Sequence, residues 1–191
     1  MKFTREQALA HLREYNKDES HIKHALAVEA AMKYFARQSQ EDEEKWGIVG
    51  LLHDIDWEHT EQAPEKHTHL AALWLKEKGY ADDIIRAVQA HGWGLTSDVE
   101  PHTLMEKTLF AVDELTGLII AAALVRPSKS LQDLQVKSVK KKWKDKAFAR
   151  GVDRDVIQKG VDMLDMSLDE MIDGVLEALR PIEEELGLGI E

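Results

Sequence analysis

Apolar residues recur at spacings of three and four along almost the entire chain, the pattern of amphipathic helices. Within one segment, for example, Ala25, Val28, Met32 and Phe35 follow this spacing. The sequence has no alternating runs long enough for a sheet, and proline occurs only four times. A length of 191 residues suits one domain. The sequence therefore predicts an all-α fold, a single-domain helical bundle that spans 1–191.

Capping residues and helix breakers predict where the individual helices begin and end. Ser20 is expected to cap the second helix, and Ser130 with Asp133 is expected to form a capping box that opens another. The remaining predicted boundaries, taken from the same signals, are about 4–15, 21–38, 46–55, 66–78, 82–91, 103–125, 153–163 and 168–185.

Charge and composition exclude several classes of function. The 25 basic and 36 acidic residues give a net charge of −11, which disfavours a nucleic-acid binder because phosphate contacts dominate such affinity. No run approaches the roughly 18–20 uncharged apolar residues of a membrane span, and the start lacks the pattern of a secretory signal. The absence of cysteine removes disulfides and thiolate metal sites. We therefore expect a cytoplasmic protein without membrane or nucleic-acid partners.

Several ionisable residues face inward from different predicted helices: His24, His53, Asp54, His91 and Asp113. A lone inward histidine is more often a hydrogen-bonded core residue, and Asp113 alone could pair with a buried Lys or Arg. Taken together, however, they need mutual partners, because an unpaired buried carboxylate is very costly. A shared cation satisfies them all. Imidazole with carboxylate favours Mn, Fe, Co, Ni or Zn over Ca and Mg.

The order and spacing of four of these residues resemble the HD superfamily of metal-dependent phosphohydrolases. His24 lies in an early helix, the buried helix ends in the dipeptide His53-Asp54, and Asp113 lies in a distant helix. The resemblance implies that these four side chains bind the first metal ion.

Two further histidines resemble the additional ligands of two-metal members of this superfamily. His67 and His91 match them, and the resemblance implies that Asp54 bridges the two ions. The sequence departs from other members directly after the motif, where Asp56 and Trp57 stand in place of a frequent glycine and lysine.

The resemblance implies a reaction in which a metal-bound water attacks a phosphorus atom. Besides Asp54, a carboxylate near the motif is expected to orient this water or to protonate the leaving group, and Asp56 and Glu58 are the catalytic candidates. Both could equally be loop or helix-end residues that contact solvent.

One basic segment stands out in this acidic chain. Between 126 and 150, nine Lys or Arg residues oppose two Asp residues. A solvated helix face is the usual role of such a run. Arg126, Lys129 and Lys137 are the candidates for binding substrate phosphate, because they follow the helix that carries Asp113.

These inferences predict an HD-type domain with its metal-site core at about 21–124 and C-terminal helices at 130–186 packed on it. The expected function is a metal-dependent hydrolase, with one or two ions, that cleaves a phosphate ester of a small molecule such as a nucleotide. Two alternatives stay open: a two-iron oxygenase, which resembles the same scaffold and uses the same six ligands, and a non-catalytic ligand-binding module. We expect a monomer or a homodimer.

Overall fold

The computed structural model describes residues 3–189, and its regular structure is helical, which confirms the predicted all-α fold. No β-strand occurs among these residues. The helices, in chain order, are α1 (Arg5–Tyr15), α2 (Glu19–Gln38), α3 (Glu43–Leu52), α4 (Trp57–Thr60), α5 (His69–Lys78), α6 (Asp82–His91), α7 (Leu104–Leu124), α8 (Val136–Lys144), α9 (Arg154–Met163) and α10 (Leu168–Leu179), with short 3-10 helices at Pro64–Lys66 and Arg180–Ile182.

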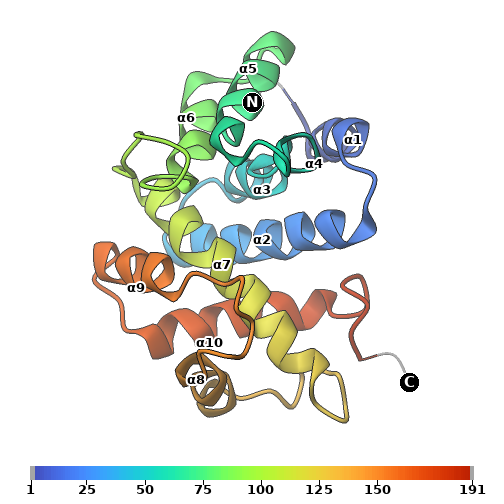
Figure 1. Ribbon diagram of the computed structural model, residues 1–191, viewed down its shortest axis with the longest axis vertical. Coiled ribbons are helices and arrows are strands. Elements are labelled where there is room, and N and C mark those ends of the chain that lie inside the picture. The colour runs from blue at the N-terminus through green and yellow to red at the C-terminus, as the bar shows by residue number, and fades with distance from the viewer. Residues whose placement is uncertain (1–2, 190–191) are drawn as a thin grey trace.

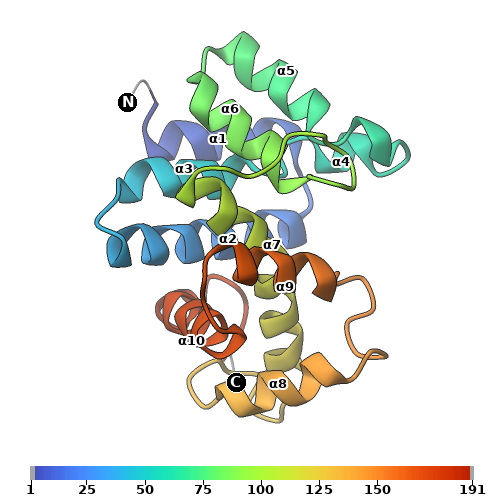
Figure 2. The same ribbon diagram turned by 90° about the vertical axis from the view of Figure 1, so that its left-hand side faces the viewer.

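Two long helices, α2 and α7, cross the middle of the molecule (Figure 1). Helix α2 packs along α3 and also contacts α7 and α10. Helices α5 and α6 lie on one side of this central pair, and α8 and α10 lie on the other in both views (Figure 2). Helix α9 packs on α7. Within the described residues, no helix is both long and apolar enough to cross a membrane.

The buried apolar side chains form one cluster that includes helices from both ends of the chain. Val28 of α2, Leu51 of α3, Leu115 of α7, Ile157 of α9 and Leu176 of α10 are all fully buried in it. Because burial of apolar surface is the main driving force of folding, the C-terminal helices stabilise the same core as α2 and α3.

Several predicted helix ends agree with the structure. The capping box opened by Thr4 and the one opened by Ser167 are both present. Helix α6 has the predicted bounds, and α7 begins after Thr103, as expected. The starts of α1, α7 and α10 were predictable because their capping side chains contact their own first turn, whereas α6 has no side-chain cap and was predicted from its apolar spacing.

Other predicted ends are wrong. Helix α2 begins before Ser20, because Asp18 is its cap. Helix α3 ends at Leu52, three residues earlier than expected, and a turn follows. The capping box at Ser130 does not form, and α8 begins only at Val136. Asp133 pairs with Arg126 and accepts from Ser128 instead of reaching back to Ser130, and the Ser130 hydroxyl donates to Glu183.

Helices α2 and α3 approach each other closely at Gly50. A Cβ atom at this position would lie 2.8 Å from Cα and 2.9 Å from the backbone nitrogen of Glu29. Both of these are backbone atoms that cannot move aside separately, so only glycine fits. This close approach brings His24 on α2 near His53, directly after α3.

We expect Gly50→Ala to lower the free energy of unfolding by about 1–3 kcal/mol, because the added methyl group pushes two packed backbones apart. Gly117→Ala in α7 is the matched control, since no atom lies within 4 Å of its Cβ position. There the substitution should be neutral or stabilising by up to about 1 kcal/mol. Chemical denaturation measures both variants, and equal stability of Gly50→Ala and the unsubstituted protein would contradict the packing argument.

Candidate metal centre

Six side chains from separate parts of the chain converge at one point. Helix α2 supplies His24, and the turn after α3 supplies His53 and Asp54. The segment before α5 supplies His67, the end of α6 supplies His91, and the middle of α7 supplies Asp113. They form two groups of three, and in each group the ligand atoms lie within 4.8 Å of one another.

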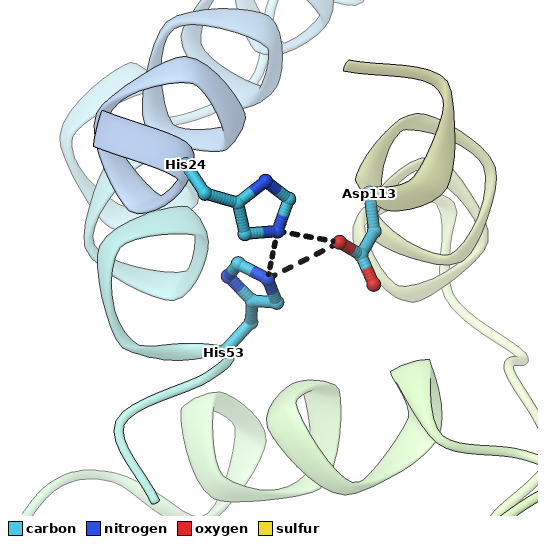
Figure 3. Close-up of side chains that lie close together, drawn as sticks. All are labelled: His24, His53 and Asp113. Atoms are coloured by element: carbon cyan, nitrogen blue, oxygen red, sulfur yellow. Dashed lines mark hydrogen bonds and ion pairs between the residues drawn. The ribbon is translucent and has the colours of Figure 1, made fainter. Parts of the chain in front are cut away.

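The first group contains His24, His53 and Asp113, whose side chains point toward one another (Figure 3). Oδ1 of Asp113 is 3.0 Å from Nε2 of His24 and 3.3 Å from Nε2 of His53. The two Nε2 atoms are 3.2 Å apart. One cation at this point can contact all three side chains with little movement.

The second group contains Asp54, His67 and His91. The Nε2 atoms of the two histidines are 3.1 Å apart, and each lies 3.3 Å from Oδ1 of Asp54. The other oxygen of Asp54, Oδ2, faces the first group, at 3.4 Å from Nε2 of His53 and 3.7 Å from Nε2 of His24. Asp54 therefore turns one oxygen to each group, as a carboxylate that bridges two cations does.

Hydrogen bonds on the far side of three rings fix their orientation. Nδ1 of His53 donates to the carbonyl oxygen of Gly50 at 2.8 Å, and Nδ1 of His91 donates to that of Val88. In His67, Nδ1 donates to Oδ1 of Asp56 at 2.8 Å. A neutral histidine that donates through Nδ1 carries its lone pair on Nε2, the atom that faces the centre. Such outer hydrogen bonds are typical of metal-binding histidines.

The family model of the HD domain matches residues 22–118, just over half of the chain. This range includes all six converging side chains. The chain belongs to the HD domain family. Neither the curated proteins nor the solved structures that were searched gave a significant match. The family places the chain in a superfamily of metal-dependent phosphohydrolases whose HD domains bind divalent metals, and the two groups of side chains are able to hold such ions.

The donor atoms of this HD domain suit divalent transition metals. Four imidazoles and two carboxylates converge, and no thiolate is available. When Asp54 is counted as a ligand of both ions, the first ion would have four protein ligands and the second ion would have three. Fewer than six protein ligands leaves coordination positions for water and substrate.

The electrostatics of the HD site also favour a cation. Burial opposes charge on His53, but the neighbouring carboxylates of Asp54 and Asp113 outweigh it and raise its pKa well above the ordinary value. Burial likewise opposes ionisation of Asp113, yet His53 and His24 hold its pKa below the usual range. Burial, reinforced by the charge of Asp113, raises the pKa of Glu114 to about 8. Burial also opposes ionisation of Asp54, but His53 holds its pKa well below the usual range. The two ligand carboxylates thus stay ionised in a partly buried place and attract positive charge.

Asp56 lies behind the HD site, away from solvent. It is fully buried, its Oδ1 accepts from His67, and its Oδ2 accepts from the backbone N–H of Ala71 at 2.8 Å. Thr68, which lies between His67 and Ala71 in the sequence, has a positive φ of 67°, which is unusual for a β-branched residue. Asp56 therefore joins the ligand His67 to the first turn of α5, and its full burial keeps it from contacting a substrate.

The structure does not bring Glu58 to the HD site. One of its carboxylate oxygens accepts from the backbone N–H groups of Lys17 and Asp18, both at 2.8 Å, and lies 3.2 Å from Nδ1 of His21. These contacts connect α4 to the loop before α2, so Glu58 has a structural position outside the cavity.

The basic residues expected to bind phosphate also lie away from the HD site. Arg126 follows the end of α7, and the eleven residues from Asp113 to that end span about 16 Å. Its guanidinium pairs with Asp133 at 2.6 Å. Lys129 lies in the loop after α7, and Lys137 lines a separate surface groove on α8. The length of α7 between Asp113 and its end separates these residues from the metal centre. The sequence pattern alone did not indicate this distance.

A cavity of about 620 Å³ opens over the HD site. Besides five of the six converging side chains, its walls contain Trp57, Leu95, Glu114 and, from the segment near α9, Gly151 and Val156. Of these wall residues, only Trp57 was indicated by the sequence, because it lies close to the predicted ligands; Trp93, which the sequence indicated equally, does not line the cavity. Glu114 follows a predicted ligand directly, which was an available signal, but Gly151 and Val156 lie outside the family match and reach the cavity only through the packing of α9 on α7.

Proposed function

We propose that this HD domain is a metal-dependent hydrolase that cleaves a phosphate ester of a small molecule with a metal-activated water. The observation that supports it best is the position of Asp54, with one oxygen 3.3 Å from two histidines and the other facing the first group. Paired metal ions at such a bridge are typical of enzymes that displace a phosphoryl group, because the pair stabilises both the attacking and the leaving oxygen.

Each group of residues would contribute a separate part of this reaction. Bound divalent ions lower the pKa of water toward neutrality and offset charge on phosphoryl oxygens. The six ligands hold the ions, and the hydrogen bonds to Gly50, Val88 and Asp56 keep three imidazole rings in orientation. The partly apolar cavity excludes bulk water around the ester, which strengthens these electrostatic contacts.

The test is phosphate release from a panel of phosphate esters, with protein stripped of metal and reloaded with Mn, Fe, Co, Ni or Zn. We expect release that requires a metal and is the same in air and under nitrogen. Oxygen consumption by the iron-loaded protein without phosphate release would instead identify an oxygenase. Absence of turnover with every metal would identify a binding module. Either result would contradict the proposal.

We expect Asp56→Asn to weaken binding of the second ion about 10–100-fold while the first ion binds as before. An asparagine can accept from His67 or from Ala71 but not from both, because its NH₂ group then faces another donor. The His67 ring would lose its orientation or its tautomer. Titration with Zn against a competing chelator measures both affinities.

Glu58→Gln is the control for this variant, because Glu58 is close in sequence but contacts the loop before α2. It should bind both ions with unchanged affinity. If Asp56→Asn also binds both ions normally, Asp56 does not position His67.

A further inference from the structure

Among the described residues, the walls of the cavity offer no lysine or arginine side chain to a substrate. His21 lies at its edge, but this ring is already within 3.2 Å of Glu58 and 3.9 Å of Glu61. Glu61 and Glu114 line the cavity as well, and a carboxyl group in either protonation state gives a phosphate oxygen no cationic partner.

The charge of the metal centre matches one phosphate group. Two divalent ions with the carboxylates of Asp54 and Asp113 leave a net charge of about +2, which the roughly −2 charge of one phosphate monoester offsets. A second or third phosphate would have to lie among the walls beyond the ions. There it would meet Glu61 rather than Lys or Arg, so no cation would offset its charge and the nearest charged wall residue would have the same sign.

The remaining walls are suited to an apolar group. Trp57 and Leu95 line the cavity although 40% and 65% of their surface, respectively, is exposed to solvent. The Trp57 ring lies 5.3 Å from that of His67, so an apolar surface begins directly beside the second group of ligands. Pro64, Thr60 and Val156 extend these walls. Large apolar side chains exposed at a concave site are typical of surfaces that a ligand covers.

The size of the cavity permits an organic group as well as a phosphate. Its volume of about 620 Å³ lies within the range of roughly 300–1,000 Å³ that is typical of small-molecule sites. Since the ions hold the phosphate at one end, most of this volume is left for the remainder of the substrate.

We infer that the site takes phosphate monoesters whose organic part is uncharged, apolar and about the size of one or two rings, and that it discriminates against polyphosphates. This inference rests on the proposed hydrolase function. Trp57 and Leu95 would bind the organic part, and Glu61 would repel additional phosphate groups.

Matched substrates test the inference with the metal-loaded, full-length protein. We expect kcat/KM for naphthyl phosphate to exceed that for glycerol phosphate at least about tenfold. We expect kcat/KM for a nucleoside monophosphate to exceed that for the corresponding triphosphate by a similar factor. A triphosphate used as well as its monophosphate, or glycerol phosphate used as well as naphthyl phosphate, would overturn the inference while the proposed function stands. Absence of phosphate release from every ester would overturn both.

Two substitutions examine the walls directly. Leu95→Ala should lower the ratio of kcat/KM for naphthyl phosphate over glycerol phosphate about tenfold, and Glu61→Lys should raise the ratio for triphosphate over monophosphate. Leu73→Ala is the control, because Leu73 is similarly exposed at 52% but does not line the cavity. Leu95 is exposed, so its replacement should leave the fold intact. Unchanged ratios in both variants would contradict the assignment of these walls.

Discussion

Replacing Asp54 with asparagine is expected to remove both metal ions and to lower phosphate release at least about a thousandfold. The two oxygens of Asp54 face different groups of ligands, and an amide has only one oxygen, which carries no full charge. Metal ions contribute several kcal/mol to the stabilisation of a phosphoryl transition state, and each factor of ten in rate corresponds to about 1.4 kcal/mol. Elemental analysis after dialysis and the rate of phosphate release measure the two effects.

Asp173→Asn is the matched control for this variant. Asp173 is exposed on α10, outside both groups of ligands and the cavity. Its replacement with asparagine is the same chemical change as in Asp54→Asn. It should retain both ions and full activity. Circular dichroism melting would establish that Asp54→Asn is folded. A folded Asp54→Asn protein that still binds two ions would show that Asp54 does not bridge them.

Replacing His67 or His91 with alanine is expected to reduce the metal content from two ions to one. Each removes one of three protein ligands of the second ion, whereas the four ligands of the first ion remain. Loss of one ion from a two-ion centre should lower the rate at least about a hundredfold, because one of the two reacting oxygens then lacks its cation. Elemental analysis and phosphate release again provide the measurements.

His69→Ala is the control for the second ion. His69 is exposed at the start of α5, two residues from His67, and belongs to neither group of ligands. This variant should behave like the unsubstituted protein. If the unsubstituted protein binds one ion, and His67→Ala and His91→Ala bind one ion as well, the two-ion centre is wrong.

The fold was predictable because its main signal is local. Helical spacing of apolar residues defines α6, and caps that contact their own first turn define the starts of α1, α7 and α10. The end of α10 at Leu179 lies six residues before the expected end at about 185. The failures occur where a side chain has another partner. Asp133 pairs with Arg126, so the capping box expected at Ser130 does not form.

The candidate ligands were also predictable, since buried histidines and carboxylates need partners and their order resembles a known family. The contacts that surround these ligands were not predictable from the sequence. Asp56 could be a catalytic acid, a solvated residue or a support for His67, and only the hydrogen bonds to His67 and Ala71 distinguish these roles. Likewise, the distance from Asp113 to Arg126 depends on α7 staying straight and helical to its end.

An anomalous-scattering map of crystals grown with Mn is the most direct test of a centre in which six side chains bind two cations bridged by Asp54. We expect two peaks about 3.5–4 Å apart, one beside His24, His53 and Asp113 and the other beside His67 and His91, with Asp54 between them. A single peak, or peaks away from these side chains, would contradict this two-ion centre.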